Sequence, residues 1–234
     1  MRPGAWLVTV CVLGVAADAG ELMPVARAQM CVTEGAIEAA GAARSGGESR
    51  WSVNVPKMRA YLNVKTAAIV EARFRYLGST GDEARLGSGE LRRQFGLKLR
   101  AQDACNLVYA MWRIEPESKL VVSVKSNPGQ HSSSECGNRG YRNIKPGRSV
   151  PVPVLSAGAE HSLRAEMSAE RLRVFADNAL VWDGSVAPEG LQFDGPVGIR
   201  SDNARLELEL RAGPPSKAAT AQPPACRTGA EQAE

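Results

Sequence analysis

The chain has 234 residues, with 29 Lys and Arg against 25 Asp and Glu, two His, 44% apolar residues and 5% aromatic residues. This length fits one domain with flanking segments, because domains typically contain roughly 100–200 residues. The apolar and charged fractions exclude a wholly disordered or collagen-like chain. The net charge of +4 is spread without a basic block, which argues against nucleic acid as a partner, and two His make a multi-His metal centre unlikely.

The first 28 residues have the pattern of a secretory signal peptide. Arg2 precedes an apolar stretch at residues 6–17, and Ala26-Arg27-Ala28 forms a small-residue cleavage site. The apolar stretch is shorter than the roughly 20 residues of a membrane span. A retained internal helix is the alternative, and Ala17-Asp18-Ala19 is a second candidate cleavage site. We therefore predict a secreted or periplasmic protein that is not inserted in a membrane after cleavage.

Four cysteines follow residue 28, and an even number favours two disulfides in an oxidising compartment. Three pairings are available. We favour Cys105 with Cys136, which would tie neighbouring strands or loops. Cys31 would then pair with Cys226, because the ends of a compact domain often lie close together. Zinc binding is the alternative, but the sequence has no CxxC pair.

Composition divides the exported chain into three parts. Residues 29–50 are rich in Ala and Gly with weak periodicity, and we predict a loosely packed lead-in. Residues 213–234 hold four prolines and almost no large apolar side chain, which indicates a disordered tail. The folded body therefore covers residues 51–212.

Within the body, apolar and polar residues alternate with a period of two. Val70, Ala72, Phe74 and Tyr76, for example, are separated by Glu or Arg. The same alternation recurs in the segments 94–101, 106–114, 119–125, 163–167, 172–176, 179–183 and 206–210. Alternation bounded by Gly, Asp, Asn and Pro is typical of half-buried antiparallel strands. So many strands in one body predict an all-β fold, an antiparallel two-sheet jelly-roll sandwich.

The second half carries the most specific pattern. Residues 161–186 (HSLRAEMSAERLRVFADNALVWDGSV) and 193–212 (FDGPVGIRSDNARLELELRA) resemble the closing strands of concanavalin A-like lectin/glucanase, or laminin-G-like, jelly rolls. There a hairpin and a "GIRSDNA" turn lead into the last strand. Residues 74–113 look like the central strands of secreted bacterial members, which include the 3-keto-disaccharide hydrolase-like group. The resemblance implies the fold, but this superfamily mixes lectins, glycosidases and structural modules.

Two catalytic arrangements fit the sequence poorly. Retaining glucanases of this superfamily place paired acids on one strand, roughly 5 Å apart. The nearest match, Glu207-Leu208-Glu209, lacks the middle Asp and the third acid, and its glutamates are better interpreted as the solvent face of a strand. A serine hydrolase would need a G-x-S-x-G elbow, which is absent. We predict that His131 and His161 lie at the surface, His131 beside Cys136 at the rim of a site.

Calcium is an alternative cofactor, because many lectins of this fold use it. Asp82-Glu83, Asp177-Asn178 and Asp202-Asn203 offer oxygen ligands. A calcium ion takes six to eight oxygens, so no pair alone is a site. Asp-Asn pairs between strands are first of all turn residues. We therefore predict no required cofactor and no metal ligands, and keep calcium as the alternative.

The segment 92–113 carries the candidate ligand-binding residues. If Phe95, Leu97 and Leu99 face the core, the polar side chains of that strand line the opposite face of the sheet. The next strand adds Tyr109 and Arg113 in one register or Trp112 in the other, so the candidates are Gln94, Lys98, Arg100, Tyr109, Trp112 and Arg113. Amide and guanidinium donors beside an aromatic plate suit a saccharide. A solvated basic face with Trp112 in the core is the alternative.

We therefore predict an exported, lectin-like carbohydrate-binding module for a polysaccharide or, because Lys98, Arg100 and Arg113 are cationic, an acidic saccharide. Binding residues concentrate on ordered loops, so the loop 126–142 is a candidate wall, with Asn127, Gln130, Asn138, Arg139 and Tyr141. Two alternatives stay open. A glycoside-cleaving enzyme like the 3-keto-disaccharide hydrolases would need a deep cleft with carboxylates of perturbed pKa. A structural or adhesive protein-binding module would need an exposed apolar patch.

Overall fold

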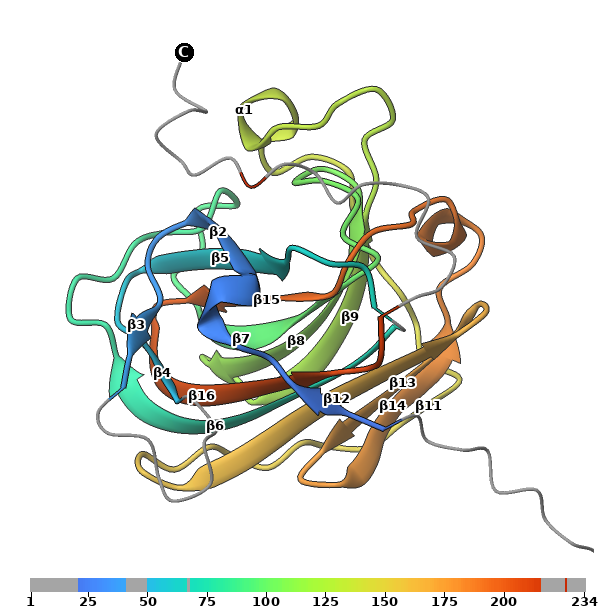
Figure 1. The fold of residues 1–234 in the computed structure, drawn as a ribbon. Coiled ribbons are helices and arrows are strands. Elements are labelled where there is room, and N and C mark those ends of the chain that lie inside the picture. The colour runs from blue at the N-terminus through green and yellow to red at the C-terminus, as the bar shows by residue number, and fades with distance from the viewer. Residues whose placement is uncertain (1–20, 41–49, 67, 216–225, 227–234) are drawn as a thin grey trace, which may run out of the picture.

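The computed structural model describes residues 21–40, 50–66, 68–215 and Cys226. These residues form two antiparallel sheets that pack face to face (Figure 1). Sheet A has nine strands, in the spatial order β11 (Arg148–Ser149), β14 (Ala179–Ser185), β13 (Arg171–Ala176), β12 (Glu160–Ser168), β6 (Ile69–Ser79), β16 (Ala204–Ala212), β4 (Trp51–Val53) and β3 (Glu38–Ala39), with β1 (Met23–Pro24) paired to β16. Sheet B has seven strands, in the order β10 (Tyr141–Asn143), β9 (Lys119–Lys125), β8 (Leu107–Glu115), β7 (Arg93–Leu99), β15 (Gly198–Asp202), β5 (Lys57–Leu62) and β2 (Met30–Glu34).

Helices occur only as short connections in the described residues. They are η1 (Arg27–Gln29), α1 (Ser133–Cys136) and η2 (Glu189–Leu191). Within the same residues, no helix combines the length and the apolar character needed to cross a membrane.

The predicted all-β fold, an antiparallel two-sheet sandwich, is confirmed. The eight segments predicted as strands coincide with β6, β7, β8, β9, β12, β13, β14 and β16. Residues 198–202 differ, because they form β15 in the middle of sheet B rather than a turn. This strand is hydrogen-bonded to β5 on one side and β7 on the other, so pairing with its neighbours produces it.

The core lies between the sheets and contains alternate residues of each strand. Phe74 of β6 packs against Phe95 of β7 and Trp112 of β8, with ring centroids 4.9 and 5.9 Å apart. Trp112 is 0% exposed and belongs to this core, whereas Tyr109 lies in a separate cluster on the other face of sheet B. The prediction that Trp112 contacts a ligand is therefore wrong, because the register of β8 turns its side chain inward.

His161 also differs from its prediction as a surface residue. Its ring lies 5.8 Å from that of Trp112 and 6.1 Å from that of Phe74, and only 11% of its side chain is exposed. His161 is the second residue of β12, and its ring contacts the aromatic side chains of the core. His131, by contrast, is exposed as predicted.

Both predicted disulfides are present. Cys105, in the loop before β8, is bonded to Cys136 of α1, and Cys31 of β2 is bonded to Cys226. The second bond joins residues 195 positions apart, so it ties the C-terminal part of the chain to a buried position of sheet B.

The described N-terminal segments are integrated into the fold, which differs from the loosely packed lead-in predicted over 29–50; residues 41–49 of that range lie outside the described residues. Met30 of β2 and Ile37 are buried in the core, and β3 pairs with β4. Residues 1–20 of the predicted signal peptide lie outside the described residues, but residues 23–28 lie within the fold. Val25 is 7% exposed, and its amide donates a hydrogen bond to the carbonyl of Leu210 at 2.9 Å. Pairing with existing sheet edges orders these segments despite their weak periodicity.

Only residues 213–215 and Cys226 of the predicted tail are described. Gly213 donates a backbone hydrogen bond to Ile69 at 2.8 Å, and Pro215 forms an isolated bridge with Thr66.

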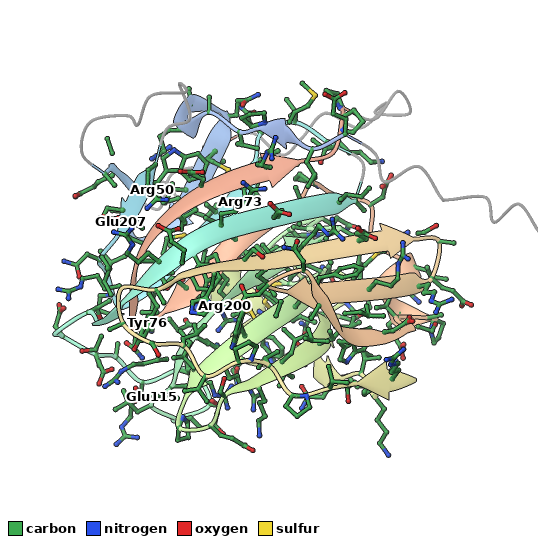
Figure 2. All side chains as sticks on the ribbon, turned by 90° about the horizontal axis from the view of Figure 1, so that it is seen from below. Arg50, Arg73, Tyr76, Glu115, Arg200 and Glu207 are labelled. Atoms are coloured by element: carbon green, nitrogen blue, oxygen red, sulfur yellow. A yellow bond between two sulfur atoms is a disulfide. The ribbon has the colours of Figure 1, made fainter. Side chains whose placement is uncertain are left out.

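The outer face of sheet A carries paired charges. Figure 2 shows Arg50 and Glu207 together at one end of this face, where Nη1 of Arg50 lies 3.6 Å from Oε2 of Glu207. Nε of Arg50 lies 3.3 Å from Oε1 of Glu209. Because Leu208 between them is buried, the interpretation of Glu207-Leu208-Glu209 as the outward face of a strand is confirmed.

Cleavage after Ala28 would remove β1, whereas cleavage after Ala19 would keep it. We expect a protein that begins at residue 29 to be less stable than one that begins at residue 20, by about 1–3 kcal/mol for the lost burial of Val25 and its neighbours. Urea unfolding of the two proteins measures the difference. Equal free energies of unfolding would contradict a structural role for residues 23–28.

The core position of Trp112 predicts a large effect on stability. Trp112→Ala should lower the free energy of unfolding by about 3–5 kcal/mol, because it leaves a cavity against Phe74 and Phe95. Chemical denaturation measures this loss, with Trp112→Phe as a milder control. If Trp112→Ala left stability unchanged but abolished ligand binding, the result would contradict the core position and indicate that Trp112 contacts the ligand.

Candidate ligand-binding site

The face of sheet B that points away from the core carries a row of polar and aromatic side chains. Alternation along β7, β8 and β15 places them there, and they are Gln94, Lys98, Tyr109, Arg113, Arg200 and Asp202. The register sets Gln94 between Arg113 of β8 and Asp202 of β15. Four of the predicted residues, Gln94, Lys98, Tyr109 and Arg113, therefore share one face.

Two hollows open on this face and share Glu90, Arg92 and Arg113. The first, which we call the tyrosine hollow, measures about 190 Å³ and is lined, among others, by Arg92, Gln94, Tyr109, Arg113, Asn138, Tyr141, Asn143 and Arg200. The second, which we call the proline hollow, measures about 390 Å³ and extends to Pro116, Glu117 and Lys119. Pockets for small molecules typically measure roughly 300–1,000 Å³, so the two adjoining hollows offer enough space for a small ligand.

Asp202 organises the charges beneath the tyrosine hollow. It is fully buried, and its Oδ1 accepts a hydrogen bond from Nη2 of Arg59 at 2.6 Å. Its Oδ2 accepts hydrogen bonds from Nε2 of Gln94 at 2.7 Å and from Nε of Arg200 at 2.8 Å. Burial opposes ionisation of this carboxyl, but Arg200, Arg59 and Gln94 together lower the pKa of Asp202 to about 2. Asp202 thus joins β5, β7 and β15 by charge-assisted hydrogen bonds.

Tyr109 and Tyr141 form the aromatic wall of the tyrosine hollow. Their rings stack with centroids 6.0 Å apart and planes 24° apart. Arg200 lies against both, because its Cζ is 5.1 Å from the centroid of Tyr109 and its Nη1 donates to Oη of Tyr141 at 3.0 Å. Tyr109 is buried, whereas Tyr141 is 38% exposed. Tyr141 therefore presents an aromatic surface that a ligand can contact.

The positive charge of Arg200 acts on both phenols. Burial raises the pKa of Tyr109 above its usual range. Burial would also raise the pKa of Tyr141, but the charges of Arg200 and Lys125 outweigh it and lower that pKa. Lys125 itself lies over the ring of Tyr141, with Nζ 5.2 Å from the centroid.

Lys98 is buried beside the tyrosine hollow without lining it. It lies between Tyr109 of β8 and Gly198 of β15, and its amino group forms no hydrogen bond or ion pair with any residue that the structure describes. Burial, and then the charges of Arg59 and Arg200, lower the pKa of Lys98 to about 7. Its predicted role as a ligand contact is therefore not supported by the position of the hollow.

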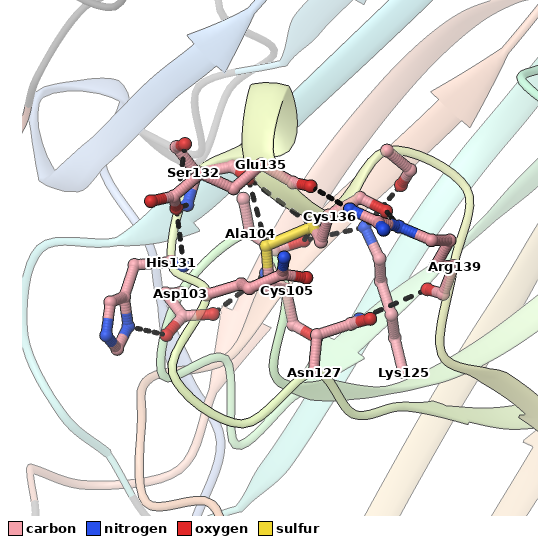
Figure 3. The surroundings of a disulfide bond; sticks show 12 residues. Asp103, Ala104, Cys105, Lys125, Asn127, His131, Ser132, Glu135, Cys136 and Arg139 are labelled. Carbon is pink, nitrogen blue, oxygen red and sulfur yellow. Dashed lines mark hydrogen bonds and ion pairs between the residues drawn. A yellow bond between two sulfur atoms is a disulfide. The ribbon is translucent and has the colours of Figure 1, made fainter.

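The loop 126–142 forms one wall, and Asn138 and Tyr141 line the tyrosine hollow as predicted. Figure 3 shows the disulfide of Cys136 at its base and the side chain of Lys125 beneath it. Nζ of Lys125 donates to the carbonyl oxygens of Ala104 at 3.1 Å and Gly137 at 2.9 Å.

The other predicted loop residues hold the wall rather than line the hollow. Nδ2 of Asn127 donates to the carbonyl of Arg139 at 3.1 Å, and the carbonyl of Gln130 accepts a hydrogen bond from Asn106 at 2.8 Å. The wall is therefore fixed both covalently and by hydrogen bonds from side chains to backbone carbonyls.

Residues 80–92 form the facing wall, which Asn203 holds in place. Oδ1 of Asn203 accepts from the amide of Ala84 at 2.8 Å, and its Nδ2 donates to the carbonyls of Ala84 at 2.9 Å and Arg92 at 3.0 Å. A Cβ built on Gly87 would lie 3.1 Å from Cβ of Asn138, so the two walls meet beside the hollow. Asn203 has a φ of 54°, a conformation that Asn adopts more readily than most residues.

Arg100 lies away from the hollows, which corrects its prediction as a ligand contact. It follows β7 with a φ of 49°, and this turn breaks the alternation that placed it on the binding face. Its guanidinium donates to the carbonyl of Ala169 at 3.0 Å and to that of Gly190 at 3.4 Å.

Sequence reasoning missed several residues that line the tyrosine hollow, among them the polar residues Arg92, Asn143 and Arg200. The signal for Arg200 was its alternation with Ile199 and Ser201, which puts it on the same face as Asp202, in a segment assigned to a turn.

The Asp-Asn pairs considered for calcium have other partners. Oδ1 of Asp177 accepts from the amide of Ser162 at 2.7 Å, and Asp202 binds two arginines. Across the described residues, no three His, Cys, Asp or Glu side chains gather as a metal ion requires.

No family model matches the chain, and no curated protein matches it. Among solved structures, it is similar to the carbohydrate-binding module CBM66 from Bacillus subtilis, with 12% identity, a TM-score of 0.48 and coverage of 77% of this chain and 91% of that one. Domain 4 of AbnA, a GH43 extracellular arabinanase from Geobacillus stearothermophilus in complex with arabinotriose, is also 12% identical, with a TM-score of 0.43 and coverage of 80% and 84%. The carbohydrate recognition domain of Emp46p in its metal-free form is 11% identical, with a TM-score of 0.44 and coverage of 79% and 87%.

With identities of 11–12% and TM-scores of 0.43–0.48, these likenesses carry no argument about function, so the ligand has to be inferred from the site itself.

The charge on Asp202 should stabilise the fold strongly. Asp202→Asn keeps the shape of the side chain but leaves Arg59 and Arg200 without their shared carboxylate. We expect the free energy of unfolding at neutral pH to fall by about 3 kcal/mol or more. Asp183→Asn, which removes an exposed ion pair with Arg171, is the matched control and should change stability by less than about 1 kcal/mol.

The same variant should change the acid dependence of stability. The pKa of Asp202 is lowered in the folded protein, so its contribution is fully present above the unfolded value of about 3.9 and is lost as the pH falls toward about 2. The native protein should therefore lose stability more steeply over this range than Asp202→Asn. Urea unfolding at a series of pH values tests this, and parallel curves would contradict it.

Proposed function

We propose that this chain is an exported carbohydrate-binding module. Its ligand is a polysaccharide or an acidic saccharide, which binds at the tyrosine and proline hollows. The observation that carries the proposal is the partly exposed ring of Tyr141, stacked on Tyr109 and surrounded by planar donors. Sugars present an apolar ring face and a rim of hydroxyls, so an aromatic plate beside amide and guanidinium groups matches both. Asn138 and Asn143 are exposed and line the same hollow, and their side-chain amides form no hydrogen bonds within the described residues.

The carboxylates at the hollows favour binding over glycoside cleavage. Glu90 and Glu117 line the hollows, and each is held by a neighbouring cation, Arg92 and Lys119 respectively. Cleavage needs two carboxylates on either side of the scissile bond, one of which usually has a raised pKa. The paired glutamates support a role in recognition.

Export is supported by the signal-peptide pattern and by the two disulfides, which persist in oxidising compartments. A glycan array probed with the purified protein, once with calcium and once with a chelator, tests saccharide recognition and metal dependence together. Binding to a defined class of glycan supports the proposal. No binding by protein with a native circular dichroism spectrum would overturn it.

Tyr141→Ala should weaken binding to the glycan found on the array by about tenfold or more, because it removes the exposed aromatic surface. Phe175→Ala is the matched control, since Phe175 packs under Arg164, 4.4 Å from the ring centroid, on the outer face of sheet A. Isothermal titration calorimetry gives the affinities. Equal loss in both variants, or none in Tyr141→Ala, would place the ligand elsewhere.

A further inference from the structure

The charged side chains at the two hollows are paired, with one exception. Arg92 is paired with Glu90, Lys119 with Glu117 at 2.5 Å, and Arg200 with Asp202 at 2.8 Å. These residues line one or both hollows, apart from Asp202, which lies beneath. The guanidinium of Arg113 forms neither an ion pair nor a hydrogen bond with any residue that the structure describes.

Arg113 is also incompletely solvated. Its Nε is buried without a hydrogen-bond partner. Burial lowers the pKa of Arg113, and this effect outweighs the opposing charge of Glu117. Burial likewise lowers the pKa of Arg92, and the charges of Arg113 and Arg200 lower it further. The positive charges around the tyrosine hollow therefore repel each other, and a buried cationic nitrogen without an acceptor is costly.

The position of Arg113 is central to the site. It lies on β8 between Gln94 of β7 and Lys119 of β9, and it lines both hollows where they meet. Glu90 and Glu117 do not neutralise it, because each already holds another cation.

We propose that the saccharide is anionic and that Arg113 binds its carboxylate or sulfate group at the junction of the two hollows. This inference rests on the proposed function and names the ligand class and the anchor within it. A guanidinium fork matches the planar geometry of a carboxylate and two oxygens of a sulfate, and it loses less hydration than an ammonium group would. The neutral part of the ligand then lies against Tyr141 in the tyrosine hollow, and the acid group gives Arg113 the acceptor that the protein does not supply.

Two other cations are less suited to this role. Arg200 already has its charge paired with Asp202 and donates a further hydrogen bond to Tyr141, so two of its five N–H donors are used within the protein. Lys98 has no partner, but it does not line either hollow. Arg113 alone combines an unpaired charge with a position on both hollows, among the residues that the structure describes.

The test compares pairs of saccharides that share a sugar backbone, of which one member carries acid groups and the other is neutral. The purified protein is titrated with oligogalacturonate and its methyl ester, and with dextran sulfate and dextran, together with any neutral glycan found on the array. Arg113→Gln should weaken binding to the acidic member of a pair by about 10- to 100-fold, because it removes a charge-assisted bidentate contact. Arg113→Lys should restore part of that affinity, since charge returns without the fork.

Arg100→Gln is the matched control, because it removes a positive charge from the end of β7 away from the hollows. Loss in Arg113→Gln but not in Arg100→Gln supports the anchor, and the pair affected tells carboxylate from sulfate. Equal loss in both variants would indicate only general attraction of polyanions and overturn it. Binding of neutral glycans alone, or binding that Arg113→Gln leaves unchanged, overturns the anionic ligand while keeping carbohydrate recognition. No binding of any saccharide by the folded protein overturns both.

Discussion

The buried carboxylate of Asp202 is the interaction on which the binding face depends. It holds Arg59 of β5, Gln94 of β7 and Arg200 of β15, so one side chain joins three strands of sheet B. A buried ion with this many donors can stay charged, whereas removing it would leave two cations without their common partner. Arg200, fixed in this way, in turn supports Tyr109 and Tyr141. The aromatic wall is thus positioned by electrostatics beneath it rather than by apolar packing alone.

This arrangement leaves an excess of positive charge. Asp202 is shared by two arginines, and Lys98 and Lys125 lie close enough that the charges of Arg59 and Arg200 lower the pKa of each. A protein selected for stability alone gains nothing from such crowding, because like charges in a partly buried site destabilise the fold. An anionic ligand relieves it. Binding sites regularly depart from the most stable arrangement, so the excess itself favours a functional interpretation.

Alternation in the sequence predicted most strands but only part of the site. Gln94 and Lys98 were assigned to the correct face because Phe95, Leu97 and Leu99 between them are clearly apolar. On β8 the pattern was ambiguous, because Leu107 and Met111 make the outward face apolar as well, and both registers of Trp112 and Tyr109 fitted.

Long-range pairing decided what local pattern did not. β15 is a strand because it pairs with β5 and β7 on either side. Its five residues are too few for alternation alone to predict a strand. Arg100 does not reach the site because its own φ is positive, which turns the chain at the end of β7. Apolar and polar alternation gives no sign of such a turn. Pairing likewise orders the N-terminal strands, since β2 pairs with β5 and β3 pairs with β4.

Both walls of the site are held in place by the protein itself. One wall is fixed by the disulfide of Cys105 and Cys136 and by Lys125, and the other by the side chain of Asn203. Because the disulfide and the hydrogen bonds from Lys125 and Asn203 to backbone carbonyls fix these loops, we expect the loops to keep their shape when a ligand binds. A preformed site loses less conformational entropy on binding, which matters most for small polar ligands that bury little apolar area. Because the walls are already ordered, specificity falls to the few side chains with unused donors, and of these Arg113 carries a charge.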